Sequence, residues 1–142
     1  MQVPLEHWVI PDRMTLLFWL IDLGLVSTVL VYGLLTHAVD PLVEVDYTLR
    51  VLAPFWIAWT LIGPICGVYS SRARNAVGWN VGLTILAWSL AAGVGSVIRA
   101  TGFFPGNAPF IFVLVTVGVG LPVLVIGRLI VMKIIPISYE NI

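Results

Sequence analysis

MTLLFWLIDLGLVSTVLVYGLLT, the segment from Met14 to Thr36, decides the fold because it is almost entirely apolar and its only charged residue is Asp22. An α-helix of this length, rising about 1.5 Å per residue, would be roughly 34 Å long, which is enough to cross the ~30 Å hydrocarbon core of a bilayer. The segment therefore predicts a transmembrane span. A carboxylate near the middle of such a span is costly, so Asp22 is the first residue that needs an explanation.

The composition extends this conclusion to the whole chain. Of its 142 residues, 60% are hydrophobic and 10% are charged, whereas about 25% of residues in ordinary soluble domains are charged. A soluble fold of this size could not bury so much apolar surface, because small domains leave a large fraction of their surface exposed. Seven basic and seven acidic residues give a net charge of zero. The apolar composition predicts that membrane lipids surround the chain, in a cell membrane. The zero net charge predicts no nucleic-acid partner.

Three further apolar stretches follow the first one. The spans are expected at residues 14–36, 51–69, 79–99 and 110–132. An N-terminal segment at residues 1–13 is expected to lie along the membrane surface, and a short tail at residues 133–142 to lie in the cytoplasm. The predicted fold is all-α, an integral membrane bundle of four transmembrane helices.

The distribution of basic residues predicts the orientation of this bundle. With four spans, two basic residues, Arg50 and Arg99, fall on one side of the membrane, and the other five fall on the opposite side. The positive-inside rule then places both termini in the cytoplasm. The five residues on that side are Arg13, Arg72, Arg74, Arg128 and Lys133.

Depth within the membrane selects a partner for Asp22. Asp22 lies about 12 Å from the cytoplasmic end of the first span, and Arg128 lies about 6 Å from the same end of the last span. The long side chain of Arg128 can extend toward the carboxylate, whereas Arg99 leaves the third span on the other side. We therefore predict an intramembrane polar pair of Asp22 and Arg128, with Asn80 and Thr84 as further polar partners. The pair would either fix the helix register or form a proton or cation site, and Arg128 has lipid phosphates as an alternative partner.

Small residues and prolines indicate packing faces and kinks. Residues such as Gly and Ser, spaced four apart, let transmembrane helices approach closely. Prolines inside a helix remove a hydrogen bond and bend it. The expected helix-packing residues are Gly63, Gly67, Ser89, Ala92, Gly93 and Ser96, and the expected kinks are at Pro64 and Pro122.

No catalytic or metal-binding pattern accompanies these features. Cys66 is the only cysteine, and no cluster of histidine, cysteine and carboxylate residues has the spacing of metal ligands. No nucleophile has a base nearby in the sequence. We therefore expect no enzyme activity, no metal site and no cofactor.

Several short motifs resemble those of a known family. They are an aspartate in the first span, Ala-Pro-Phe followed by a tryptophan, an arginine that closes the third span, and a last span with Phe-x-x-Val that ends in Gly-Arg. The residues are Asp22, Ala53, Pro54, Phe55, Trp59, Arg99, Phe112, Val115, Gly127 and Arg128. Together they resemble domain of unknown function 3054, a set of small four-helix membrane proteins of archaea and bacteria. The resemblance covers residues 14–132 and implies the architecture, with no assigned activity.

Two functions of different classes fit the sequence. The first is a small non-catalytic membrane protein, an accessory or structural subunit that packs against other membrane proteins or against a copy of itself. Small-residue helix faces and short loops indicate this function. The alternative is an oligomeric transporter or channel for a small solute or ion, with Asp22 and Arg128 in the permeation path. Four spans enclose little volume, so the alternative needs at least a dimer.

Overall fold

The computed structural model describes residues 12–37, 39–101 and 110–135, and within these ranges the only regular elements are helices. They are α1 (Arg13–Thr36), α2 (Val45–Ile65), α3 (Ser71–Asn75), α4 (Val77–Ala100) and α5 (Phe110–Ile134). All except α3 are long and apolar enough to cross a membrane. For the described residues, the prediction of an all-α fold with four helices long and apolar enough to span a membrane is therefore confirmed. The expected surface segment at residues 1–13 and the expected tail lie mostly outside the described residues.

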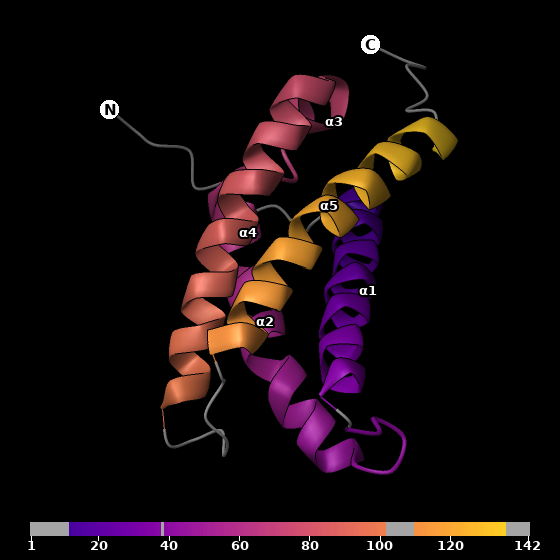
Figure 1. Ribbon diagram of the computed structural model, residues 1–142. Coiled ribbons are helices and arrows are strands. Elements are labelled where there is room, and N and C mark those ends of the chain that lie inside the picture. The colour runs from indigo at the N-terminus through magenta and orange to yellow at the C-terminus, as the bar shows by residue number, and fades with distance from the viewer. Residues whose placement is uncertain (1–11, 38, 102–109, 136–142) are drawn as a thin grey trace.

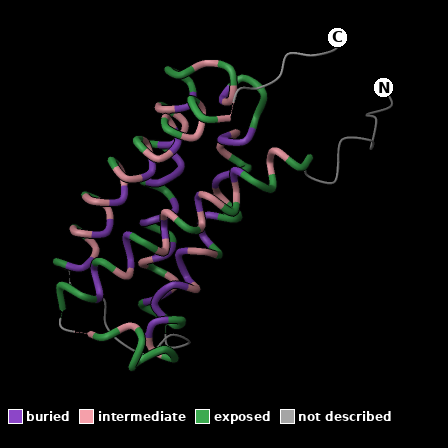
Figure 2. The backbone as a smooth tube through the Cα atoms, turned by 90° about the vertical axis from the view of Figure 1, so that its right-hand side faces the viewer, coloured by how far each residue is buried: buried purple, intermediate pink, exposed green. Residues whose placement is uncertain are grey.

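The four long helices pack into one bundle (Figure 1). α2 packs against α1 and α4, and α5 also packs against α1 and α4. The start of α1, the end of α2, the short helix α3, the start of α4 and the end of α5 lie together, at what we call the α3 end. The end of α1, the start of α2 and the end of α4 lie at the opposite end, called here the distal end. Each long helix buries one side in the bundle and exposes the other (Figure 2).

Glycines let large aromatic side chains fill the space between the helices. A Cβ atom added at Gly120 of α5 would lie 2.3 Å from the indole ring of Trp88 on α4. A Cβ atom added at Gly95 of α4 would lie 2.7 Å from the ring of Phe55 on α2. Both rings are fully buried. Such close contact between backbone and side chain supplies the van der Waals attraction that holds helices together in lipid.

Two tryptophans connect α1 to α2 by hydrogen bonds. The Trp19 indole N–H of α1 donates to the Thr60 hydroxyl of α2 at 3.1 Å. In the other direction, the Trp56 indole N–H of α2 donates to the Ser27 hydroxyl of α1 at 2.9 Å. The two bonds join the helices at separate heights, so they restrict sliding of α1 along α2.

α2 differs most from its predicted span, which ran from residue 51 to residue 69. The helix begins earlier, at Val45, because its polar first turns remain helical, with an ion pair of 2.8 Å between Asp46 and Arg50 one turn apart. It ends at Ile65, so Pro64 lies inside the helix in its last turn, and a kink at Pro64 stays a prediction. Pro122 lies inside α5. The other long helices begin and end within two residues of their predicted limits.

A Schellman motif centred on Gly67 ends α2. Gly67 has a φ angle of +76°, in the left-handed region that glycine adopts without strain. Its N–H donates to the carbonyl of Pro64 at 2.9 Å, and the N–H of Val68 donates to the carbonyl of Gly63 at 3.1 Å. These two bonds define the motif. The expected GxxxG packing pair therefore does not hold for Gly67, which reverses the chain after the helix; Gly63 remains in α2, against the ring of Tyr69.

Asp12 caps the first turn of α1, and its removal is expected to destabilise the protein. Its carboxylate accepts a hydrogen bond from the Thr15 backbone N–H at 2.7 Å and lies 3.2 Å from a guanidinium nitrogen of Arg74. Replacing Asp12 with alanine is expected to cost about 0.5–2 kcal/mol at neutral pH, as for other N-caps. The measurement is thermal unfolding in mild detergent, with Asp12→Asn as the control that keeps the cap.

The same carboxylate gives a pH dependence with a defined sign. The hydrogen bonds from Thr15, assisted by Arg74, lower the pKa of Asp12 from its ordinary value of 3.8. Because the pKa is lower in the folded state, the cap stabilises the protein above about pH 4 and loses this contribution as the pH falls through the folded-state pKa. An Asp12→Ala penalty that stays constant from pH 7 to pH 2.5 would contradict this assignment.

Candidate functional site

A buried ion pair between the first and the last helix is the centre of the candidate site. Asp22 of α1 is 0% exposed and Arg128 of α5 is 1% exposed. The Arg128 Nε donates to Asp22 Oδ1 at 3.0 Å, and Arg128 Nη2 pairs with Asp22 Oδ2. The guanidinium therefore binds both carboxylate oxygens, in the bidentate geometry that gives strong charge-assisted hydrogen bonds.

The turn after α2 completes a network around this pair. Because the Schellman motif reverses the chain, Val68 and Tyr69 return into the bundle, where both are buried. The Val68 carbonyl accepts from Arg128 Nη1 at 3.2 Å, and the Tyr69 hydroxyl donates to Asp22 Oδ2 at 2.7 Å. The same hydroxyl accepts from the Trp59 indole N–H at 2.9 Å. Residues of α1, α2, α5 and the connecting turn are thereby linked.

The electrostatics of this network favour a fixed arrangement. Removing unpaired charges from water costs several kcal/mol per ion, and the cost is offset only when each charge has an opposite charge and further hydrogen bonds. Asp22 and Arg128 have both. The Tyr69 hydroxyl donates its hydrogen to Asp22 and accepts one from Trp59, so both of its roles are fixed. The arrangement can hold α1, α2, α5 and the connecting turn together, and none of the buried side-chain polar atoms of Asp22, Tyr69 and Arg128 lacks a hydrogen-bond partner.

Two polar residues of α4 were expected beside Asp22, but one forms its hydrogen bond elsewhere and the other forms none among the described residues. Asn80 and Thr84 are both buried. The Asn80 side-chain amide donates to the Ala73 carbonyl of α3 at 3.1 Å, which fixes the short helix on the start of α4. The Thr84 hydroxyl has no hydrogen-bond partner among the described residues. Neither residue contributes a hydrogen bond to the ion pair.

The sequence reasoning missed Val68, Tyr69 and Trp59 as members of the network. A signal for them exists in the sequence: Gly67 follows Pro64 closely, and glycine after a helix end is typical of a left-handed cap. Ending the span at that point would have placed Tyr69 in a turn beside the bundle instead of at a span end.

The predicted packing residues of α4 lie on two different sides of that helix. Ala92 is buried, whereas Ser89 and Gly93 are exposed and Ser96 is partly exposed. The hydroxyl of Ser89 donates to the Ile85 carbonyl at 2.8 Å, and that of Ser96 donates to the Ala92 carbonyl at 2.7 Å. Both hydroxyls are thus satisfied within α4. The structure leaves Ser89 and Gly93 on its outer surface.

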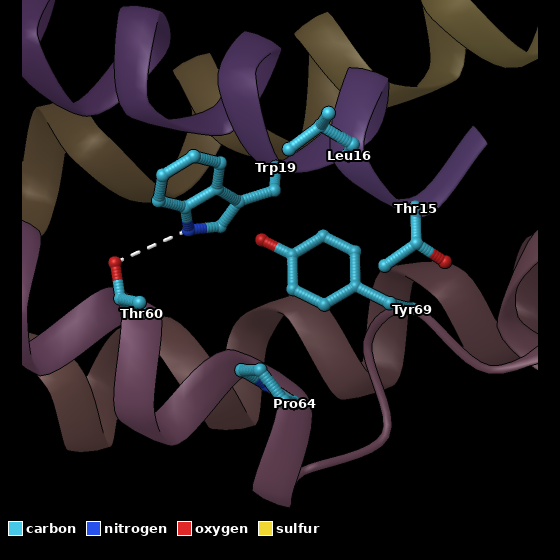
Figure 3. A pocket seen from close by; sticks show the side chains of 6 residues that line it. All are labelled: Thr15, Leu16, Trp19, Thr60, Pro64 and Tyr69. Carbon is cyan, nitrogen blue, oxygen red and sulfur yellow. Dashed lines mark hydrogen bonds between the residues drawn. The ribbon is translucent and has the colours of Figure 1, made fainter. Parts of the chain in front are cut away.

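A pocket of about 260 Å³ opens between α1 and α2 beside the network (Figure 3). Its lining residues are Thr15, Leu16, Trp19, Thr60, Pro64 and Tyr69. The ring of Tyr69 forms one wall, and the bond from Trp19 to Thr60 crosses another. This lining is mostly apolar and suits a hydrocarbon group better than an ion. Among the residues that the structure describes, no group of three or more His, Cys, Asp or Glu residues is placed to hold a metal ion.

Comparison with known proteins places the chain in a family. A family model described as "Protein of unknown function (DUF3054)" matches residues 19–131. No curated protein and no solved structure matches the chain. The matched range includes Asp22, Tyr69 and Arg128, and it runs from α1 to α5. The chain therefore belongs to the DUF3054 family of proteins of unknown function.

Proposed function

We propose that this protein is a small non-catalytic membrane subunit that packs, through the outer side of α4, against a helix of another subunit. That subunit is either a second copy of the chain or another membrane protein. The observation that supports this proposal is a row of small residues on the exposed side of α4. Its members are Gly78, Gly82, Ser89 and Gly93.

The glycines of this row have no packing role inside the bundle. A Cβ atom added at Gly78, Gly82 or Gly93 would meet nothing within 4 Å, whereas one added at Gly95, on the buried side of the same helix, would meet Phe55. Glycine within a helix costs about 0.5–1 kcal/mol relative to alanine. Glycines at helix surfaces in membranes allow a neighbouring backbone to approach closely. The row is therefore best explained by a helix outside this chain.

The buried polar pair supports the same structural function more than it supports transport. A permeation site must be reached by the transported solute, but Asp22 and Arg128 are at most 1% exposed. Their hydrogen bonds go to each other, to Tyr69 and to Val68. This geometry suits the role of fixing the helix register. A subunit that binds a partner through the outer side of α4 needs its helices held in one register.

Orientation and location form part of the proposal. The basic residues described at the α3 end are Arg13, Arg72, Arg74, Arg128 and Lys133, and those at the distal end are Arg50 and Arg99. Basic residues near span ends favour the cytoplasmic side. We therefore propose that the α3 end faces the cytoplasm in a cell membrane.

Leucine at Gly82 and Gly93 together is expected to disrupt assembly. The added side chains would fill the outer side of α4 and prevent a partner helix from approaching. In nanodiscs formed directly from cell membranes, the unchanged protein is expected as a complex with a second copy or with a stoichiometric partner, and the double variant as a monomer. The measurement is native mass spectrometry of the nanodisc contents, which also identifies the partner.

The matched control is Gly24→Leu on α1. Gly24 is exposed, and an added Cβ atom there also meets nothing within 4 Å, but α1 packs against α2 and α5 rather than α4. This variant is expected to keep the assembly intact. A monomeric unchanged protein, or a double variant that retains its partner, would overturn the proposed function.

A further inference from the structure

Arg99 of α4 is a second buried arginine, at the distal end of the bundle. It is 3% exposed, and its side chain ends in a guanidinium cation with five N–H donors. The ion pairs among the described residues are Arg50–Asp46, Arg74–Asp12 and Arg128–Asp22. Arg99 belongs to none of them. A buried charge without an opposite charge is costly, so this position calls for an anion from outside the described chain.

The hydrogen-bond geometry of Arg99 leaves donors available for that anion. Its Nη2 donates to the Tyr47 hydroxyl of α2 at 3.2 Å. Its Nη1 is buried and has no hydrogen-bond partner among the described residues. The Tyr47 hydroxyl uses a lone pair in its bond to Arg99, so its own hydrogen can still donate. Nη1 and Nη2 belong to the same guanidinium group, so the unpartnered Nη1 and the Tyr47 hydroxyl beside Nη2 can bind one oxyanion.

Phe112 of α5 restricts the direction from which an anion can bind. The guanidinium carbon of Arg99 lies 4.7 Å from the centre of the Phe112 ring, which covers one face of the guanidinium. The ring is buried and lies close against Gly33 of α1. This face is closed to an anion, whereas the side chain of Tyr47, at the edge of the guanidinium, is only partly buried.

We propose that Arg99 and Tyr47 form a binding site for a phosphate group, supplied by the headgroup of an anionic lipid. The planar fork of arginine matches two phosphate oxygens. Arg99 lies in the last turn of α4, and helix ends lie at the headgroup layer that borders the ~30 Å hydrocarbon core. A free phosphate ion offers the same chemistry, and the test separates the two sources.

The test uses the purified full chain, stripped of lipid in a maltoside detergent. It is titrated with phosphatidylglycerol, with an uncharged glycolipid of the same acyl chains, or with inorganic phosphate, and binding is followed by native mass spectrometry and by the thermal unfolding midpoint. Phosphatidylglycerol is expected to bind and raise the midpoint, and the glycolipid is expected to do neither. An equal rise of the unfolding midpoint with inorganic phosphate would contradict the proposal that a lipid headgroup supplies the phosphate.

Variants test the two residues directly. Arg99→Met is expected to weaken phosphatidylglycerol binding at least about tenfold, because it removes charge-assisted hydrogen bonds. Tyr47→Phe removes one donor and is expected to weaken binding about threefold or more. Arg99→Lys keeps the charge and is expected to bind with intermediate affinity. It serves as the folded variant if Arg99→Met is unstable.

Arg50→Met is the matched control for these variants. Arg50 is an exposed arginine near the same end of the bundle and pairs with Asp46, so its loss is expected to leave lipid binding unchanged. Unchanged binding of phosphatidylglycerol by both Arg99 variants would overturn the site. Equal binding of phosphatidylglycerol and the glycolipid by the unchanged protein would overturn it as well.

Discussion

Replacing Asp22 with asparagine is expected to destabilise the folded protein by about 3–5 kcal/mol, because the change leaves the Arg128 charge buried without its counter-ion. Asparagine keeps the size of the side chain and can still accept the hydrogen bond from Tyr69. The loss therefore reports on charge pairing more than on packing. The measurement is equilibrium unfolding of the detergent-solubilised protein by a denaturing detergent, with helix content followed by circular dichroism.

Two comparisons separate the ion pair from other effects of this substitution. Asp46→Asn makes the same chemical change in an exposed pair whose side chains are 80% and 49% exposed, and its expected cost is below about 1 kcal/mol. The double variant Asp22→Asn with Arg128→Met removes both charges and is expected to regain a large part of the lost stability. If Asp22→Asn proved as mild as Asp46→Asn, the buried pair would not have the structural role assigned to it.

Alanine at Gly120 is expected to lower the free energy of unfolding by about 1–3 kcal/mol, because overpacking forces neighbouring atoms apart. The added Cβ atom would lie 2.3 Å from the Trp88 ring, which is fully buried and cannot move without displacing its neighbours. The same unfolding experiment in detergent measures the effect. Combining Gly120→Ala with Trp88→Phe, a smaller ring, is expected to restore part of the loss.

Gly118 provides the control on the same helix. It is exposed, and an added Cβ atom would meet nothing within 4 Å. Gly118→Ala is therefore expected to be neutral or to stabilise the protein by up to about 1 kcal/mol, the usual helix preference for alanine over glycine. Equal stabilities of the two alanine variants would show that the contact between α4 and α5 is looser than described.

The spans were predictable because hydrocarbon imposes a simple rule of length and apolarity on the sequence. That rule fails at polar helix ends. Asp46 and Arg50 lie outside the hydrophobic run, yet their side chains pair one turn apart and extend α2 to Val45. The Asp–Arg spacing of four residues was a readable signal of helix. Pro64 was correspondingly placed five residues before the end of a span, although it lies in the last turn of α2.

The depth of the site residues along the helices was predictable from the sequence. The direction in which their side chains point around the helix axes was not. Counting residues from the same end of the first and the last span led to the contact between Asp22 and Arg128, and the structure has this contact. The same counting also suggested Asn80 and Thr84, but height alone does not determine which way a side chain points. Tyr69 was missed because its position depends on a chain reversal that hydropathy does not register.

The bond between Arg128 and Asp22 joins residues that are 106 positions apart, and this separation has a consequence during biosynthesis. α1 is synthesised and inserted long before α5 emerges from the ribosome. A nascent chain that stops before Phe110 leaves the Asp22 carboxylate without its counter-ion and the Val68 carbonyl without its donor. Arrival of the final helix satisfies both groups at once. A truncated chain therefore differs chemically from the complete one, because it keeps a carboxylate and a carbonyl that only the last helix satisfies.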